Sequence, residues 1–199
     1  MLAQPAAILD VGIGFGKYGF LAREYLEYWD GRIAFGAREH RIDGIEAFET
    51  YVTSLQREIY DQVYIGEATD VLSRLHRRYN LILLIDVLEH LNREDGNRLL
   101  DQCLGISEAL LVSTPIKMEE QGALFDNGFE QHRQQWAKSD FNRFDSKFFA
   151  RNAYSVICYI GDQAPQVGAA FRRGKRRAAF LELAPWLRSV KRWVKRSTK

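Results

Sequence analysis

The chain has 199 residues, 46% of them hydrophobic and 13% aromatic, which is the composition of one globular domain with a full core. No apolar run reaches about 18 residues, so the sequence of this chain excludes a membrane-spanning helix. Cys103 and Cys158 lie in apolar stretches without metal-binding or redox spacing, and we expect reduced core thiols in a cytoplasmic protein.

The formal net charge of +2 hides an asymmetry along the chain. Positions 171–199 contain eleven Lys or Arg and one acid, whereas positions 1–170 contain 17 basic and 25 acidic residues, a net charge of +10 against −8. This difference predicts an acidic domain over residues 1–165 and a basic tail over residues 166–199.

The first predicted element is a buried strand over 6–11, which runs into a glycine-rich turn and then into a helix over 18–28. Gly12, Gly14 and Gly16 stand at every second position, where they let the backbone turn sharply and let a ligand lie against it. The start of the helix offers unpaired N–H groups to the same ligand. The pattern predicts a nucleotide-like ligand. It also satisfies the dinucleotide fingerprint G-x-G-x-x-G at Gly14, Gly16 and Gly19.

Asp10 helps to distinguish which nucleotide-like ligand the glycine turn binds. A carboxylate two residues before the first glycine would repel the pyrophosphate of NAD or FAD and suits a positively charged cofactor; capping of the turn is the alternative role. Residues 8–19 resemble motif I of the class I methyltransferases that depend on S-adenosylmethionine (SAM). The resemblance implies SAM as cofactor, S-adenosylhomocysteine as product, and Asp10 at the methionine end of the cofactor.

A second strand is predicted over 41–46 and ends in an acid. In doubly wound sheets an acid at this place binds the ribose hydroxyls of an adenosine ligand, and Glu46 occupies it. A solvated loop acid is the alternative. The segment that follows, 49–60, predicts one helix with Tyr51, Leu55 and Ile59 on a common face.

A third strand with its exit turn is predicted over 63–68. The resemblance implies that an acid after this strand accepts a hydrogen bond from the adenine amine. Glu67 is favoured for this role, with Ala68 bordering the adenine, and Asp70 is the competitor. Either acid could instead cap a helix over 71–78, for which Asp70 is well placed as the N-cap.

Residues 80–85 form a continuous apolar run, typical of a central strand buried on both faces. Ligands sit beyond the carboxyl ends of such strands, so Asp86 should face the site. The segment from Asp86 to Leu91 resembles the D-x-L-E-H-L segment of small-molecule methyltransferases. It lacks the Asn/Asp-Pro-Pro-aromatic tetrapeptide of methyltransferases that act on base amines, which disfavours such an acceptor.

The remaining elements complete the expected fold. A helix over 94–104 and a strand over 109–115 give five strand-then-helix alternations, which predict a doubly wound α/β sheet. The resemblance implies a mostly parallel, Rossmann-like sheet of seven strands, with the last strands from 148–149 and 153–160.

Residues 117–135 form a long polar segment, and such a segment in a compact domain is usually functional. Asn127 to His132, followed by Trp136, is similar to an N-P-Y-E-x-H-x-x-x-W segment of some bacterial methyltransferases, many of them encoded among enzymes of glycan synthesis. Gly128 and Phe129 depart from that pattern. The loop over 117–141 is a candidate lid, besides an open site or closure by a second subunit.

Methyl transfer to a hydroxyl needs an aligned acceptor and benefits from a base near the acceptor oxygen. His132 is the first candidate base, because it lies in the substrate-facing loop and histidine is the most common general base in enzymes. His90 is the second, with buttressing of the turn as its alternative role. Glu89 and Glu130 are candidates to orient a histidine or to contact the acceptor. No Cys/His/Asp cluster has metal-ligand spacing, and we expect no obligatory metal.

The basic tail predicts an amphipathic helix, with tryptophans on its apolar face and Lys and Arg on the other. Such a helix suits an anionic membrane surface, bound through residues 171–199. Packing of the apolar face on the domain or in a homodimer is the rival reading, and binding to nucleic acid is less favoured.

Together these patterns predict an enzyme that transfers a methyl group from SAM to an oxygen of a sugar or small metabolite, including a lipid-linked glycan. We expect it in the cytoplasm, or peripherally at the inner membrane surface. The alternatives are a non-catalytic SAM-binding module localised by its basic tail, and an NAD-binding oxidoreductase.

Overall fold

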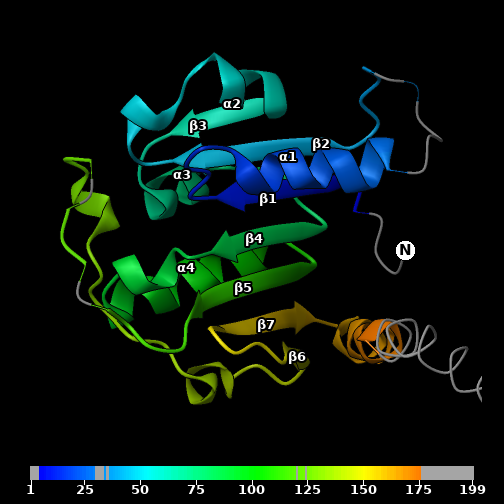
Figure 1. Ribbon diagram of the computed structural model, residues 1–199, viewed down its shortest axis with the longest axis vertical. Coiled ribbons are helices and arrows are strands. Elements are labelled where there is room, and N and C mark those ends of the chain that lie inside the picture. The colour runs from blue at the N-terminus through cyan, green and yellow to red at the C-terminus, as the bar shows by residue number, and fades with distance from the viewer. Residues whose placement is uncertain (1–4, 30–33, 35, 120, 124, 176–199) are drawn as a thin grey trace, which may run out of the picture.

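The computed structural model describes residues 5–29, 34, 36–119, 121–123 and 125–175. Seven strands form one sheet in the order β3-β2-β1-β4-β5-β7-β6 (Figure 1). Strands β1 to β5 are parallel, and β7 runs antiparallel to both β5 and β6. The predicted doubly wound, mostly parallel sheet of seven strands is confirmed. The strands are β1 (Ala7–Val11), β2 (Arg41–Glu46), β3 (Gln62–Ile65), β4 (Leu81–Ile85), β5 (Ala109–Pro115), β6 (Lys147–Ala150) and β7 (Ser155–Gly161).

Helices cover both faces of this sheet. Helices α1 and α2 lie on one face, and α3 and α4 lie on the other (Figure 1). The helices are α1 (Lys17–Arg23), which continues as a π-helical turn η1 (Glu24–Tyr28), α2 (Ser54–Ile59), α3 (Ala68–Arg74) and α4 (Arg93–Ile106), with short 3₁₀ turns η2 (Glu49–Tyr51), η3 (Leu88–His90), η4 (Gly128–Glu130) and η5 (Lys138–Phe141).

The strands divide the core into two layers because successive side chains of a strand point to opposite faces. In β1, Ile8 packs into the layer under α1, whereas Leu9 and Val11 pack into the layer under α3 and α4. In β4, Leu83 and Leu84 divide in the same way, and both are buried. The central strands are therefore buried on both faces, as their continuous apolar runs predicted.

The prediction of one continuous helix over 49–60 is wrong, because the segment is divided into the 3₁₀ turn η2 and the helix α2. Thr53 has an extended backbone, and its Oγ1 accepts from Leu55 N at 3.2 Å, so α2 starts only after this residue. Leu55 is 57% exposed, and Gln56 takes the buried face instead. Tyr51 is left outside α2, at the edge of the sheet.

The prediction of Asp70 as an N-cap is also wrong. Helix α3 begins at Ala68, with Glu67 at the N-cap position and Asp70 inside the first turn. The helix starts three residues earlier than expected, shortly after β3 ends. The turn between them contains Gly66, which has a φ of 140°. This early start brings Glu67 and Ala68 to the edge of the sheet at which ligands are expected.

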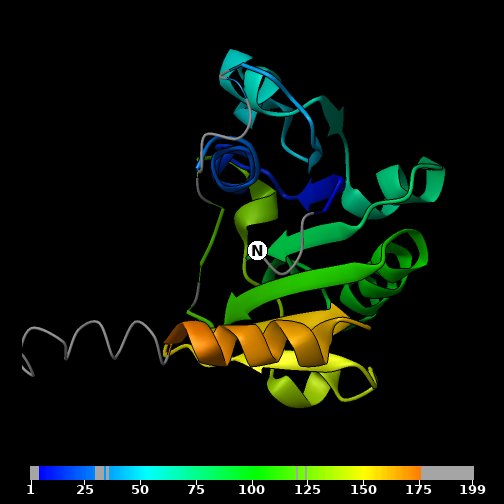
Figure 2. The ribbon, with the colours of Figure 1, turned by 90° about the vertical axis from the view of Figure 1, so that its right-hand side faces the viewer.

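A helix over 164–175 follows β7 and packs against the sheet (Figure 2). Ala164 is fully buried, and the rings of Phe148 and Phe171 lie 5.6 Å apart. The predicted boundary at residue 165 falls within this helix, and the predicted amphipathic helix of the tail lies outside the described residues. Within the described part of the chain, no helix has the length and apolarity to cross a membrane.

Candidate functional site

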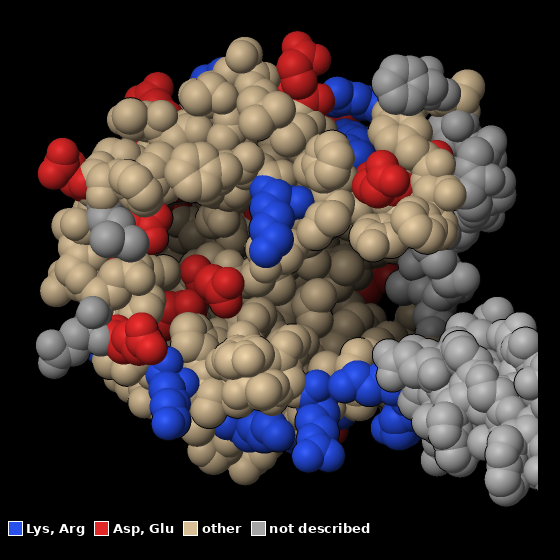
Figure 3. Space-filling view, in the orientation of Figure 1, with Lys and Arg blue, Asp and Glu red and all other residues tan. Residues whose placement is uncertain are grey.

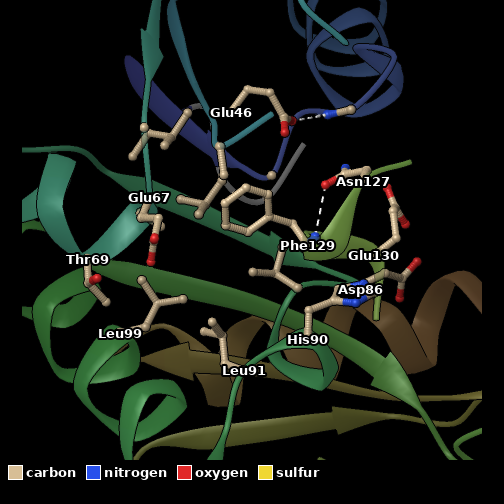
Figure 4. Close-up of a pocket in the computed structure, with 18 of the residues that line it drawn as sticks. Glu46, Glu67, Thr69, Asp86, His90, Leu91, Leu99, Asn127, Phe129 and Glu130 are labelled. Atoms are coloured by element: carbon tan, nitrogen blue, oxygen red, sulfur yellow. Dashed lines mark hydrogen bonds between the residues drawn. The ribbon is translucent and has the colours of Figure 1, made fainter. Parts of the chain in front are cut away.

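A cavity of about 280 Å³ opens at the edge of the sheet where β1, β2 and β4 end. In the space-filling view the molecule is hollowed here, and acidic side chains lie at the left and below the hollow (Figure 3). Most of the predicted cofactor-binding residues lie together around it (Figure 4). The predicted residues that line the cavity are Gly12, Gly14, Glu46, Glu67, Ala68, Asp86, His90 and Glu130.

The glycine turn forms one wall of the cavity. Gly12 and Gly14 have φ values of 75° and 48°, in the left-handed region that other residues rarely adopt. A Cβ on Gly12 would lie 2.7 Å from Cγ2 of Val87, whereas a Cβ on Gly14 would meet no atom within 4 Å. The open space over Gly14 is room for a ligand. Gly16 is buried below the turn, does not line the cavity, and faces Ile59 of α2.

Glu46 joins this turn to the end of β2. Its Oε2 accepts from Gly14 N at 2.8 Å, and its Oε1 accepts from Phe48 N at 2.9 Å (Figure 4). Burial raises the pKa of the Glu46 carboxyl, while these two bonds oppose the rise. Each carboxylate oxygen can accept a second hydrogen bond, so Glu46 can also accept from ligand hydroxyls.

Asp10 is not placed where the sequence suggested. Its side chain does not line the cavity; it is buried under the turn, where Oδ2 accepts from the Tyr60 hydroxyl at 2.6 Å. The same Tyr60 oxygen accepts from Gly19 N at 3.1 Å. Burial raises the pKa of Asp10 to about 7. Asp10 therefore supports the glycine turn from below, and direct contact with the methionine end of a cofactor is not supported.

Asp86, which follows β4, lines the cavity in a strained conformation. Its φ is 55°, which is costly for a residue other than glycine and is found mainly where a site requires it. The Asp86 backbone N–H donates to Ser113 O at 2.9 Å, and burial raises the pKa of its side chain. The structure thus holds a carboxylate at the end of the central strand, as the sequence predicted.

The segment over 116–135, yellow-green in Figure 1, lies across this edge of the sheet. Its C-terminal end is anchored by Trp136, which is fully buried and donates from Nε1 to Leu88 O at 2.9 Å. The hydroxyl of Tyr51, which lies in the turn after β2, donates to Glu130 Oε1 of this segment at 3.1 Å. The segment therefore covers the cavity, and Asn127, Phe129 and Glu130 line it.

Two histidines face each other next to the cavity. The rings of His90 and His132 lie 5.1 Å apart. His90 Nδ1 lies 3.3 Å from Gln131 O, and His132 Nδ1 lies 2.7 Å from Glu119 O. Because a carbonyl oxygen only accepts, Nδ1 carries the proton in both rings, and Nε2 is left with a free electron pair in the neutral form.

Glu89 completes this cluster. One ligand atom each from Glu89, His90 and His132 lie within 4.8 Å of one another. Glu89 is 2% exposed, and its Oε2 has no hydrogen-bond partner among the described residues. Burial raises the pKa of Glu89 to about 7 and lowers that of His90. The sequence predicted no metal, but this donor set fits a divalent cation.

The charge of the cavity favours a cationic ligand. Five carboxylates line it, and the basic side chain in the same lining is Arg133. A pyrophosphate would meet mostly repulsion there. In the sequence, the negative charge of Asp10 was the reason to disfavour NAD. In the structure, that reason comes instead from the carboxylates that line the cavity: Glu46, Glu67, Asp86, Asp95 and Glu130.

Sequence reasoning missed several residues of the site. Tyr51 was expected on a helix face, and Asn127 and Phe129 received no role, although they belong to the segment that resembled a methyltransferase motif. Phe129 projects into the cavity between Glu46 and Glu67 (Figure 4). Tyr60, the partner of Asp10, carried no signal in the sequence.

The sheet order with a reversed β7, and a ligand cavity beside the glycine turn, give this chain the α/β fold of the class I SAM-dependent methyltransferases. The fold that the resemblance implied is thus confirmed. No protein-family model matches the chain.

Solved structures support this assignment of the fold. An O-methyltransferase family protein from Burkholderia thailandensis aligns with a TM-score of 0.55 at 11% identity, over 80% of this chain and 52% of that protein. The N-terminal domain of EvdMO1, crystallised in the presence of S-adenosylhomocysteine and D-fucose, aligns with a TM-score of 0.54 at 13% identity, over 79% of this chain and 76% of that chain.

A curated relative is the small RNA 2'-O-methyltransferase of Tetrahymena thermophila. It is 24% identical over 121 residues, which are 56% of this chain and 28% of that protein. This chain therefore spans well under half the length of the curated relative.

Proposed function

We propose that this protein is a SAM-dependent methyltransferase whose acceptor atom is a hydroxyl oxygen. The observation that carries the proposal is the cavity itself: a glycine turn open above Gly14, Glu46 for the ribose, and carboxylates that suit the ammonium and sulfonium charges of SAM. Glu67, with Ala68, borders the place of the adenine.

The cluster of Glu89, His90 and His132 supports an oxygen acceptor. A hydroxyl is a poor nucleophile until its proton is removed or polarised. His132 Nε2 carries a free electron pair in the neutral form and can take that proton. If a divalent cation were held by the same three residues, the Nε2 electron pair of His132 would be donated to the cation, and the Lewis acidity of the cation would lower the pKa of the hydroxyl in place of the histidine base. Two similar proteins are named as O-methyltransferases, which agrees with this acceptor atom.

The acceptor is proposed to be a sugar or another small hydroxyl compound. The structure of EvdMO1 was obtained with D-fucose present, and the Tetrahymena relative is named for methylation of a ribose oxygen in RNA. Fucose and ribose are both sugars that carry ring hydroxyl groups. A homodimer, a membrane contact of the basic tail and a cytoplasmic location remain part of the proposal from the sequence.

Calorimetric titration with S-adenosylhomocysteine tests the cofactor. We expect micromolar binding to the wild-type chain and roughly 10- to 100-fold weaker binding to Glu46→Gln, because a charged acceptor for the ribose hydroxyls is lost. Glu49→Gln is the matched control, since Glu49 is exposed and lies outside the cavity. Binding of NADH without binding of S-adenosylhomocysteine would support the oxidoreductase instead. Binding of S-adenosylhomocysteine without methyl transfer to any acceptor would support the non-catalytic module.

A further inference from the structure

A second cavity, of about 390 Å³, lies beside the first. This volume is in the range of small-molecule sites. Its walls come from the end of β5, the segment that follows β5, and the turn between β6 and β7. The residues that matter for its chemistry are Ile116, Lys117, Glu119, Gln121, His132 and Tyr154.

His132 connects the two cavities. It lines the second cavity, and its ring lies 5.1 Å from the ring of His90, which lines the first. The segment over 116–135 also contributes to both cavities, so one segment covers the two together. A molecule in the second cavity can therefore present an atom to His132 next to the place where a methyl donor would lie.

The polar lining of the second cavity has one cation and one carboxylate, Lys117 and Glu119. A polyanion would need several cations, as phosphate-binding surfaces have. Hydroxyl groups both donate and accept, so they can pair with the Glu119 carboxylate and the Lys117 ammonium at the same time. The charges of this cavity thus favour an uncharged, hydroxyl-rich ligand.

Tyr154 adds a flat apolar surface to this cavity. Tyr154 is 84% exposed, although two hydrogen bonds fix its backbone. Tyr154 N donates to Asn152 Oδ1 at 2.7 Å, and Tyr154 O accepts from Ile116 N at 2.8 Å. An aromatic ring presented to solvent on a fixed turn is suited to pack against the C–H face of a ring-shaped ligand.

We propose that the second cavity is the acceptor site and that it takes an uncharged sugar ring, with its C–H face on Tyr154, its hydroxyls toward Lys117 and Glu119, and the reacting hydroxyl toward His132. This assignment rests on the proposed methyltransferase function and names the substrate class of that function. Nucleic acid is not the acceptor in this arrangement.

Saturation-transfer NMR on the full chain, loaded with S-adenosylhomocysteine, tests the proposal. The probes are the methyl pyranosides of glucose, mannose, fucose and rhamnose at millimolar concentration. We expect at least one of them to bind, and to bind about two- to tenfold more weakly to Tyr154→Ala, because the packing surface is lost. Phe20→Ala is the matched control, since Phe20 is 57% exposed on α1 and lines neither cavity.

Three results would overturn the proposal: no pyranoside binds, binding to Tyr154→Ala is as strong as to the wild type, or an RNA oligonucleotide binds through Tyr154 while the pyranosides do not. The affinity for S-adenosylhomocysteine, measured separately by calorimetry, should be equal in the two variants and the wild type. If the wild-type chain did not bind S-adenosylhomocysteine, the proposed function would be contradicted. If it bound S-adenosylhomocysteine but none of the pyranosides, only the proposed acceptor site would be contradicted.

Discussion

Glu89 and His90 lie in the turn after β4, and His132 comes from the segment after β5. Their ligand atoms lie together because Arg133 N and Gln134 N donate to Glu89 O, at 2.7 Å and 3.1 Å, and so tie the two segments to each other. Both imidazole rings are oriented by main-chain carbonyl groups, which is the usual support of histidine ligands in metal sites. These hydrogen bonds therefore fix the arrangement of the cluster.

Mn²⁺ should bind to the wild-type chain and raise its free energy of unfolding by about 2.7 kcal/mol when the concentration is a hundredfold above the dissociation constant. Glu89→Gln and His132→Ala should lose this stabilisation, and His76→Ala, at an exposed position, should keep it. The measurement is thermal unfolding with and without Mn²⁺, with manganese uptake followed by electron paramagnetic resonance. Equal uptake by His132→Ala would show that the three residues do not form a metal site.

Helix α4 holds the segment over 116–135 in place through Trp136. The indole ring packs directly on Gly96, where a Cβ would lie 2.3 Å from Cζ2 of the ring. The guanidinium of Arg93 lies 4.3 Å above the same ring. Because Trp136 also donates to Leu88 O, one side chain connects α4, the turn after β4 and the end of the covering segment. The position of His132 therefore depends on the packing of residues that do not themselves line the cavity.

Gly96→Ala should displace Trp136 and lower the free energy of unfolding by about 1–3 kcal/mol, the usual cost of overpacking a core. Gly105→Ala on the same helix is the matched control, because a Cβ there meets no atom within 4 Å. It should leave stability unchanged or raise it by up to about 1 kcal/mol. Urea unfolding of both variants measures the difference. If Gly96→Ala were as stable as Gly105→Ala, the assigned packing of Trp136 would be wrong.

At the scale of the whole molecule, two buried acids couple stability to pH. Burial raises the pKa of Asp10 and of Glu89 to about 7, from 3.8 and 4.5. The folded chain then holds more protons than the unfolded chain between about pH 4 and pH 7. The stabilisation is complete below the unfolded pKa values and is lost as the pH rises through 7. In most proteins, carboxylates act in the opposite direction.

We therefore expect the free energy of unfolding to fall as the pH rises across this window, with each acid contributing at most about 1.4 kcal/mol per pH unit. Asp10→Asn removes one titrating group while keeping an acceptor for Tyr60, so it should reduce the slope and be no less stable than the wild type near pH 8. Asp162→Asn, at an exposed position, is the control. Urea unfolding at several pH values gives the slopes, and an unchanged slope in Asp10→Asn would contradict the raised pKa.

Most of the fold could be predicted from the sequence because it depends on local patterns. The apolar run that ends at Asp86 and the alternation of strands and helices require only neighbouring residues. The glycines at every second position need positive φ angles, a property of the residue itself. Because such local patterns also mark where strands begin and end, β2 and β5 have the bounds that the sequence predicted. Glu46 is the last residue of β2, and Asp86 directly follows β4.

The tertiary structure decided which of these residues face the ligand and which support it from below. Asp10 lies in β1, just before the turn that contains Gly14, yet Asp10 points to Tyr60 in the layer under α1, and Gly14 opens into the cavity. The cluster of Glu89, His90 and His132 has no spacing that a sequence pattern could recognise, because it is formed by contacts between segments far apart in the chain. The same holds for Tyr154 and Lys117, which are brought together only when β7 pairs with β5.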